Sequence, residues 1–117
     1  MLPIRDDQII VSLARDIGAA AVPELLERFR SDLSVHLDQL VHATESMDAD
    51  LLQRESHTLK SICGTFGAAE FCALMREINE ACRQGETQWA LRKASEEATR
   101  LGEETLAAYS NDHMPLS

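Results

Sequence analysis

The feature that most constrains the fold is an apolar stripe that recurs every three or four residues through the first half of the chain. Residues at these spacings share one face of an α-helix, whereas a half-buried strand would alternate polar and apolar residues. No segment shows a strand pattern, and aromatic residues, which sheets favour, make up only 4% of the chain. The sequence therefore predicts an all-α protein. The stripe consists of Leu26, Phe29, Leu33, Leu37 and Leu40.

Four further segments carry amphipathic patterns bounded by helix start and stop residues. Asp6 or Asp7 is expected to cap a short first helix that ends at Gly18, and Asp48 is expected to cap the third helix. The longer helices are expected at roughly 21–46, 49–65, 68–84 and 87–108. Long helices joined by short turns favour an antiparallel up-down four-helix bundle, with the short additional N-terminal helix packed across one end.

Length and charge limit the class of protein. A chain of 117 residues forms a single domain, with a core expected at roughly 6–108 and a frayed tail at roughly 110–117. The net charge of −9 argues against binding to nucleic acid or to an anionic membrane. No apolar run approaches the ~20 residues of a membrane span, and no signal peptide is evident. We expect a free-standing, monomeric, cytoplasmic protein.

The three cysteines are Cys63, Cys72 and Cys82, an odd number without a CxxC pair. This pattern fits neither a disulfide framework nor a zinc site. We expect reduced thiols packed as small apolar side chains, and no bound metal.

The stretch ESHTLKSICGTFGAAEF, residues 55–71, carries the residues of most chemical interest. At about 100° per residue, the apolar side chains of the third helix gather on the side opposite His57, so the imidazole is expected to face water. The same geometry places several polar or small residues on the histidine's side. They are Asp50, Gln53, Arg54, Lys60, Ser61 and Gly64.

An exposed histidine is most often a solvated surface residue, but two neighbours of His57 favour a functional interpretation. Lys60, one turn on, is no structural partner for the histidine, since both side chains would carry positive charge at low pH. Gly64, two turns on, costs a helix about 0.5–1 kcal/mol relative to alanine. Since Gly64 is expected to be exposed, the glycine is better explained by the close approach of another surface. The pattern indicates a docking platform with a nucleophile at its centre.

Several other chemistries are disfavoured. No Ser-His-Asp arrangement is evident on the helix face, and no metal-ligand set converges there. His36 and His42, on another helix, are not spaced as a pair and are expected to be solvated. No nucleotide-binding motif is present. A neutral imidazole, with a reference pKa of about 6.5, can instead attack phosphorus and carry a phosphoryl group by itself.

The segment from His57 to Ala68 resembles the signature of the histidine-containing phosphotransfer (HPt) family, roughly H-x-L-K-G-x-x-G-x-x-G-A. The flanking LLERFRSDLSVHLDQL and FCALMREINEACRQG also look like that family's helices, so the resemblance covers nearly the whole chain. One departure is Ser61, where the family commonly has glycine. A serine here is similar to one quorum-sensing branch of the family.

The resemblance implies a phosphorelay intermediate. It would accept a phosphoryl group from the receiver domain of a hybrid sensor kinase and pass it to the receiver of a response regulator, with no kinase activity of its own. No cofactor is implied for this chain, because the receiver would supply Mg²⁺.

The resemblance also implies roles for individual residues. His57 would be phosphorylated and Lys60 would steady the phosphoryl group. Gly64 would admit the partner, Gln53, Arg54 and Ser61 would line the contact, and Gly67 and Ala68 would form a turn.

Two alternatives remain open at this stage. SHTLKS is similar to the histidine box of sensor-kinase dimerisation domains, although Thr58 replaces the usual acidic residue and the expected proline is missing. Such a kinase needs an ATP-binding domain, for which the chain shows no motif. The second alternative is a helical adaptor that binds receivers without phosphotransfer, and an intact set of His57, Lys60 and Gly64 argues against it.

Overall fold

A computed structural model of the chain describes residues 1–110, and all regular structure in that range is helical. This confirms the all-α prediction. The tail expected at 110–117 lies, apart from Ser110, outside the described residues. The elements are α1 (Asp7–Ile17), a 3₁₀ turn (Ala19–Ala21), α2 (Val22–Glu45), α3 (Ala49–Phe66), α4 (Ala69–Arg83), α5 (Thr87–Lys93), a π-helical turn (Ala94–Ala98) and α6 (Thr99–Ala108).

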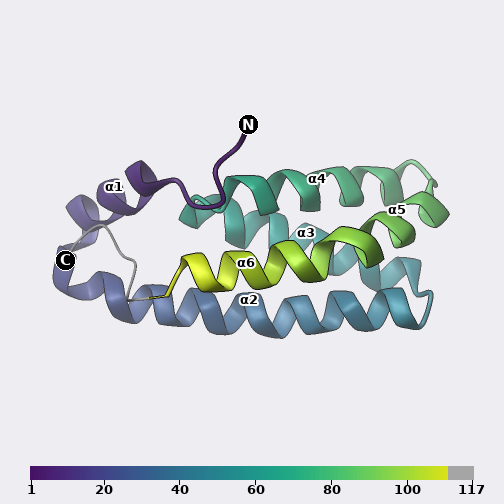
Figure 1. The fold of residues 1–117 in the computed structure, drawn as a ribbon, viewed down its shortest axis with the longest axis horizontal. Coiled ribbons are helices and arrows are strands. Elements are labelled where there is room, and N and C mark those ends of the chain that lie inside the picture. The colour runs from purple at the N-terminus through teal and green to yellow at the C-terminus, as the bar shows by residue number, and fades with distance from the viewer. Residues whose placement is uncertain (111–117) are drawn as a thin grey trace.

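The long helices run side by side along the 43 Å axis of the molecule (Figure 1). Short turns connect α2 to α3 and α3 to α4, so consecutive helices are antiparallel, and α5 and α6 together form the fourth rod of the bundle. α1 lies across one end, beside the start of α2 (Figure 1). The predicted four-helix bundle with an additional N-terminal helix is confirmed. No helix within residues 1–110 is long and apolar enough to cross a membrane.

Helix ends follow the predicted capping residues. The Asp6 carboxylate accepts a hydrogen bond from the amide of Gln8 at 3.0 Å, and Asp48 accepts one from Leu51 at 3.0 Å. Gly67 ends α3 with φ +80°, a left-handed conformation that suits glycine. A Cβ atom at Gly67 would also approach the Asp6 carbonyl oxygen to 3.0 Å. The sharp turn after α3 therefore depends on this glycine.

The core is the predicted apolar stripe of α2, whose five members are all buried. At one end of the core, the Phe29 ring stacks on Phe66 at 4.6 Å and meets Tyr109 edge-on at 4.8 Å. The buried Tyr109 hydroxyl donates to the Phe66 carbonyl at 2.6 Å. This end of the core therefore links α2, α3 and the end of α6.

The fourth rod differs from the single helix predicted for 87–108. A π-helical turn, Ala94–Ala98, interrupts it. Trp89 is exposed, with the Lys93 ammonium 5.9 Å from its ring centroid. Gly102 lies against Leu37 so closely that an added Cβ would clash with that side chain. The π-helical turn and Gly102 both lie against α2, a contact that the local sequence pattern does not encode.

The first helix buries little of its apolar surface. Of its apolar residues only Ile10 is buried, while Ile9 and Ile17 are exposed. The helix covers only the end of the bundle, where few side chains are available to bury a whole face.

The segment before α1 is attached to the turn that follows α3. The Asp6 amide donates to the Gly67 carbonyl at 2.7 Å, and the Glu70 amide donates to the Pro3 carbonyl at 2.9 Å. The Arg5 guanidinium also donates to the carbonyl of Ala108. The N-terminal segment thus holds the turn that follows α3, and Arg5 joins this segment to the end of α6.

Candidate functional site

α3 has one buried face and one face directed to solvent. Its inner face buries Leu52, Leu59 and Cys63 completely. His57 lies on the outer face, in the middle of the helix, and is exposed as predicted. The apolar periodicity thus places the imidazole outward, because the opposite face is held in the core.

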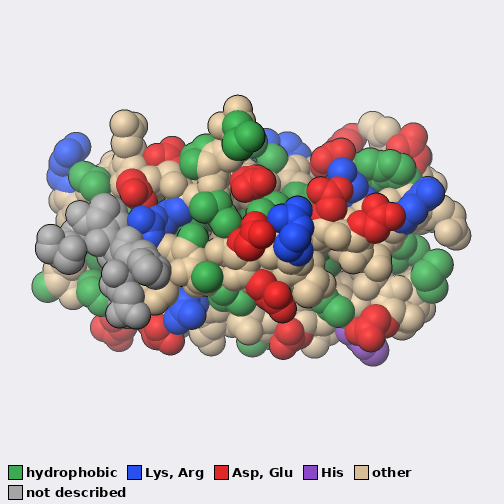
Figure 2. Space-filling view, viewed as in Figure 1, with side chains coloured by type: hydrophobic (Ala, Val, Ile, Leu, Met, Phe, Trp, Pro, Cys, Tyr) green, Lys and Arg blue, Asp and Glu red, His purple; other side chains and the backbone are tan. Residues whose placement is uncertain are grey.

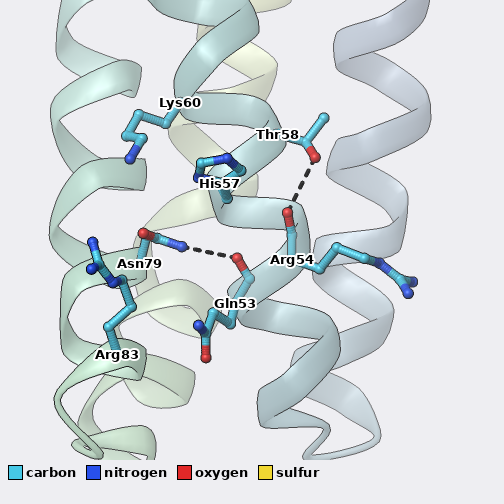
Figure 3. A pocket seen from close by; sticks show the side chains of 7 residues that line it. All are labelled: Gln53, Arg54, His57, Thr58, Lys60, Asn79 and Arg83. Atoms are coloured by element: carbon cyan, nitrogen blue, oxygen red, sulfur yellow. Dashed lines mark hydrogen bonds between the residues drawn. The ribbon is translucent and has the colours of Figure 1, made fainter.

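A shallow groove of roughly 380 Å³ lies between α3 and α4 in front of the imidazole (Figure 3). Helix α3 supplies five of its lining residues and α4 supplies two. The lining contains three cations and no carboxylate. The lining residues are Gln53, Arg54, His57, Thr58, Lys60, Asn79 and Arg83.

Two of the cations flank the imidazole and the third points away from it. Lys60 reaches across toward α4 on one side of His57, Arg83 lies beyond Asn79 on the other, and Arg54 extends away along the far side of α3 (Figure 3). The chain as a whole has a net charge of −9, and Figure 2 shows Asp and Glu side chains spread over the face that carries α5 and α6. A basic groove on an acidic protein is suited to receive an anion.

The exposed cations have acidic neighbours outside the groove. Arg83 lies 3.7 Å from the Glu80 carboxylate and Arg54 lies 3.8 Å from Glu55. The Arg83–Glu80 contact lies in water and contributes little, so this guanidinium is free to reorient toward a ligand. Glu55, in contrast, is buried.

The predicted site residues divide into two groups. The groove brings Gln53, Arg54 and Lys60 together with His57, as predicted. Ser61 and Gly64 are exposed on α3 but do not line it. The Ser61 hydroxyl donates to the carbonyl of His57 at 3.3 Å, within its own helix.

Gly64 is not required by the packing of the bundle. A Cβ atom there would meet only the Cys72 Sγ, at an ordinary contact distance of 3.5 Å, and the residue is exposed. Unlike Gly67 it has no left-handed backbone. The fold therefore gives no reason for a glycine at this position.

Sequence reasoning missed Asn79 and Arg83, the two lining residues supplied by α4. The turn at Gly67 could have pointed to them. Because α3 and α4 are antiparallel and meet at this turn, the middle of α4 lies opposite His57. The Asn79 side chain is buried, and its Nδ2 donates to the carbonyl of Gln53 at 2.9 Å and to Ser56 Oγ at 3.3 Å.

The expectation that His36 is merely solvated is wrong. Its Nδ1 donates to the Glu55 carboxylate at 2.6 Å, joining α2 to α3. Glu55 is buried, so its carboxylate needs a partner, and the half-exposed His36 provides one. Helix periodicity alone could not show this contact, because the two residues lie on different helices. His42 is exposed, as expected.

The cysteines behind the groove do not supply a second nucleophile. All three are free and buried. Burial, together with the neighbouring Cys72, raises the pKa of the Cys63 thiol to about 12, and burial also raises the pKa of Cys82. A thiol with such a pKa stays protonated near neutral pH. Within the described residues no cluster of His, Cys, Asp and Glu gathers that could hold a metal ion.

A helical bundle that exposes one histidine among cations has the features of a small phosphoryl carrier. The sequence profile of the Hpt domain matches residues 24–109, and the chain belongs to this family. Ser61 also indicated a narrower resemblance, to one branch of this family, and the relatives confirm it. The chain is 42% identical over 77 residues to the phosphorelay protein LuxU of Vibrio vulnificus, covering 66% of this chain and 67% of that protein.

Two further relatives agree with this assignment. LuxU of Vibrio cholerae is 35% identical over 74 residues, covering 63% of this chain and 66% of that protein. The crystal structure of histidine-containing phosphotransfer protein B (HptB) from Pseudomonas aeruginosa superposes with a TM-score of 0.83 at 26% identity, covering 97% of this chain and 96% of that one. The family is therefore supported by both sequence and fold.

Proposed function

We propose that this protein is a phosphotransfer intermediate of a phosphorelay, in which His57 carries the phosphoryl group between receiver domains. The group arrives from the aspartyl phosphate of one receiver and leaves to the aspartate of another. The observation that carries the assignment is the exposed imidazole of His57, which lies in a groove lined by three cations and no carboxylate, in a chain of the Hpt domain family.

The chemistry needs no group on this chain beyond the imidazole and its cations. An unprotonated ring nitrogen attacks the phosphorus atom, the N–P bond forms, and the P–O bond to the receiver's aspartate breaks. The carboxylate leaves with the bonding electron pair. The reverse sequence, with a second receiver's carboxylate as the nucleophile, returns the imidazole to its starting state.

The cations of the groove stabilise the charge that the transferring group carries. Lys60 and Arg83 lie on either side of the imidazole (Figure 3). Their positive charges favour both the dianionic phosphoryl group on the histidine and the charge that develops during transfer. Arg54, directed along the far side of α3, is better placed to meet the partner.

The partner completes the site. We assign Mg²⁺ and most of the catalytic groups to the receiver, and no cofactor to this chain. The donor is the receiver of a hybrid sensor kinase, and the acceptor is the receiver of a response regulator. Ser61 and Gly64, exposed beside the groove on the same helix, form part of the surface against which the receiver packs.

We further infer that the chain acts as a monomer in the cytoplasm, and that neither nucleic acid nor a membrane is its partner. The net charge of −9 supports the exclusion of nucleic acid and membranes, because phosphate-rich polymers and anionic lipid surfaces repel such a chain.

The test is transfer of labelled phosphate from isolated, phosphorylated receiver domains. We expect label to appear on this protein, to be lost in acid as phosphohistidine is, and to move on to a second receiver. Label that survives acid would place the phosphoryl group on a residue other than histidine. A chain that binds receivers without acquiring label from any of them would support the adaptor alternative instead.

A further inference from the structure

A buried amide joins the two walls of the groove directly beneath the histidine. Asn79 on α4 is only 4% exposed, and its Nδ2 donates to the Gln53 carbonyl at 2.9 Å and to Ser56 Oγ at 3.3 Å. The Ser56 hydroxyl in turn donates to the same Gln53 carbonyl at 3.1 Å. Figure 3 shows the amide between the His57 ring and Arg83, directed at the α3 backbone.

Both amide hydrogens of Asn79 are engaged by α3. The side chain has two N–H donors and one carbonyl acceptor. The Gln53 carbonyl accepts only, which fixes the orientation of the amide with Nδ2 toward α3. No donor of Asn79 remains for a phosphoryl group, so any effect of this residue on transfer acts through α3.

The bonded carbonyl belongs to the turn of helix that carries the histidine. In an α-helix the amide of residue 57 donates to the carbonyl of residue 53. The His57 amide, the Asn79 side chain and the Ser56 hydroxyl therefore share the Gln53 carbonyl as their acceptor. One turn beyond the histidine, the Cys72 thiol makes a weaker bond to the Lys60 carbonyl at 3.4 Å. The backbone of α3 is thus held to α4 on both sides of His57.

We propose that Asn79 is a positioning residue for His57: its bond to the Gln53 carbonyl fixes the turn of α3 from which the imidazole projects toward Lys60 and Arg83. The inference rests on the proposed function of His57. The core holds the inner face of α3, whereas the outer face that carries the imidazole packs against nothing. The bond from α4 adds a restraint on the groove side of this turn. Small displacements of a reacting group are costly, about a hundredfold in rate for 1 Å.

The decisive variant is Asn79→Leu, which keeps a similar shape but removes both donors. The matched control is Tyr109→Phe, which removes a hydroxyl that also donates to an α3 carbonyl, that of Phe66, at the far end of the helix. Both variants lose an interhelical bond to the backbone of the same helix. If Asn79 only stabilised the bundle, the two variants should change transfer to a similar extent. If it positions His57, only Asn79→Leu should slow transfer, because only this bond adjoins the histidine.

We expect Asn79→Leu to lower the maximal rate of transfer from a phosphorylated receiver by about tenfold to a hundredfold. The receiver concentration at half-maximal rate should stay unchanged, because Asn79 is buried. Ring ¹⁵N and ¹H signals of His57 in NMR spectra of the unphosphorylated protein should shift in this variant. Tyr109→Phe should keep the wild-type rate and ring signals. Ser56→Ala, which retains the bond from Asn79 to Gln53, should lose less than threefold.

Wild-type transfer and unchanged His57 signals in Asn79→Leu would overturn the proposal, and so would an equal loss in Tyr109→Phe. Should Asn79→Leu fail to fold, Asn79→Ala takes its place, because the smaller side chain leaves room for water to bond the freed groups. The same rates and NMR signals then decide the proposal. Failure of the proposed function is a separate result, since wild-type protein would then take no label. The NMR comparison does not depend on transfer.

Discussion

Two histidines on neighbouring helices have opposite surroundings. His36 on α2 donates to the buried carboxylate of Glu55 at 2.6 Å, and this bond ties α2 to α3. His57 on α3 is exposed and faces a groove lined by cations without a carboxylate. The first histidine already has its anion within the protein, whereas the second is surrounded by groups that favour an incoming anion.

The difference shows how one bundle separates stability from function. A histidine that satisfies a buried acid contributes to the fold, since the unpaired carboxylate would be costly. A histidine among cations gains nothing for the fold from its neighbours, and its environment becomes favourable only once a phosphoryl group is attached. Variants at the two sites should therefore affect different measurements.

The sharpest contrast is expected from replacing each histidine by glutamine. His57→Gln removes the nucleophile, so labelling by a phosphorylated receiver should be abolished while the helical circular dichroism and receiver binding persist. His36→Gln keeps a donor near Glu55 and leaves the groove intact, so it should label at close to the wild-type rate. Residual acid-labile label on His57→Gln would place the phosphoacceptor at another residue.

The next effect concerns stability on the His36 side. Glu55→Ala removes the buried acceptor and should lower the free energy of unfolding by about 1–3 kcal/mol. Transfer by the folded fraction should change little. The control is Glu104→Ala, which breaks an exposed contact to Arg100 and should cost less than about 1 kcal/mol. Urea unfolding measures both, and equal losses would show that the His36–Glu55 contact adds nothing to stability.

A smaller effect is expected from the groove cations. Lys60→Ala should slow transfer by roughly tenfold, less than the ~100-fold or more typical of a donor in an enclosed site, because this groove is open to water. Stability should be unchanged. The matched control is Lys93→Ala, since Lys93 is the only other lysine and lies beside Trp89. Stopped-flow or quench measurements with one receiver compare the transfer rates of the two variants. Equal rates would show that Lys60 does not contribute to transfer.

The smallest expected effect moves stability and transfer in opposite directions. Gly64→Gln should raise the free energy of unfolding by about 0.5–1 kcal/mol through better helix propensity, because the added Cβ meets no clash. The long side chain should obstruct a receiver and slow transfer. Gly64→Ala should give a similar gain in stability with a milder loss of rate. Wild-type transfer by Gly64→Gln would mean that the glycine is not kept for docking.

Much of this architecture could be predicted from local patterns. The stripe from Leu26 to Leu40 placed one long helix and its buried face, and Asp48 marked the start of α3. The turn at Gly67 was predicted from the family resemblance instead. The same periodicity predicted the exposure of His57. These features depend on contacts within one helix or on the partition of one helix between core and water, so a single segment of sequence encodes them.

Features that join different helices could not be predicted in this way. The fourth rod contains only residues that tolerate an α-helix, yet its packing against α2 includes a π-helical turn and the close approach of Gly102. The His36–Glu55 bond and the lining of the groove by Arg83 depend on which faces of two helices meet. Helix patterns give the face that is buried but not the neighbour against which it is buried.

The sequence by itself determined the helices, the outward direction of His57 and the nearness of Lys60, because these follow from a fixed rotation of 100° per residue along one chain segment. Tertiary structure alone decided that Asn79 lies beneath the histidine and that Arg83 lies beside it. Those positions depend on the axial register between α3 and α4. That register is set by the Gly67 turn together with side-chain packing across the whole interface, which is a property of many residues at once.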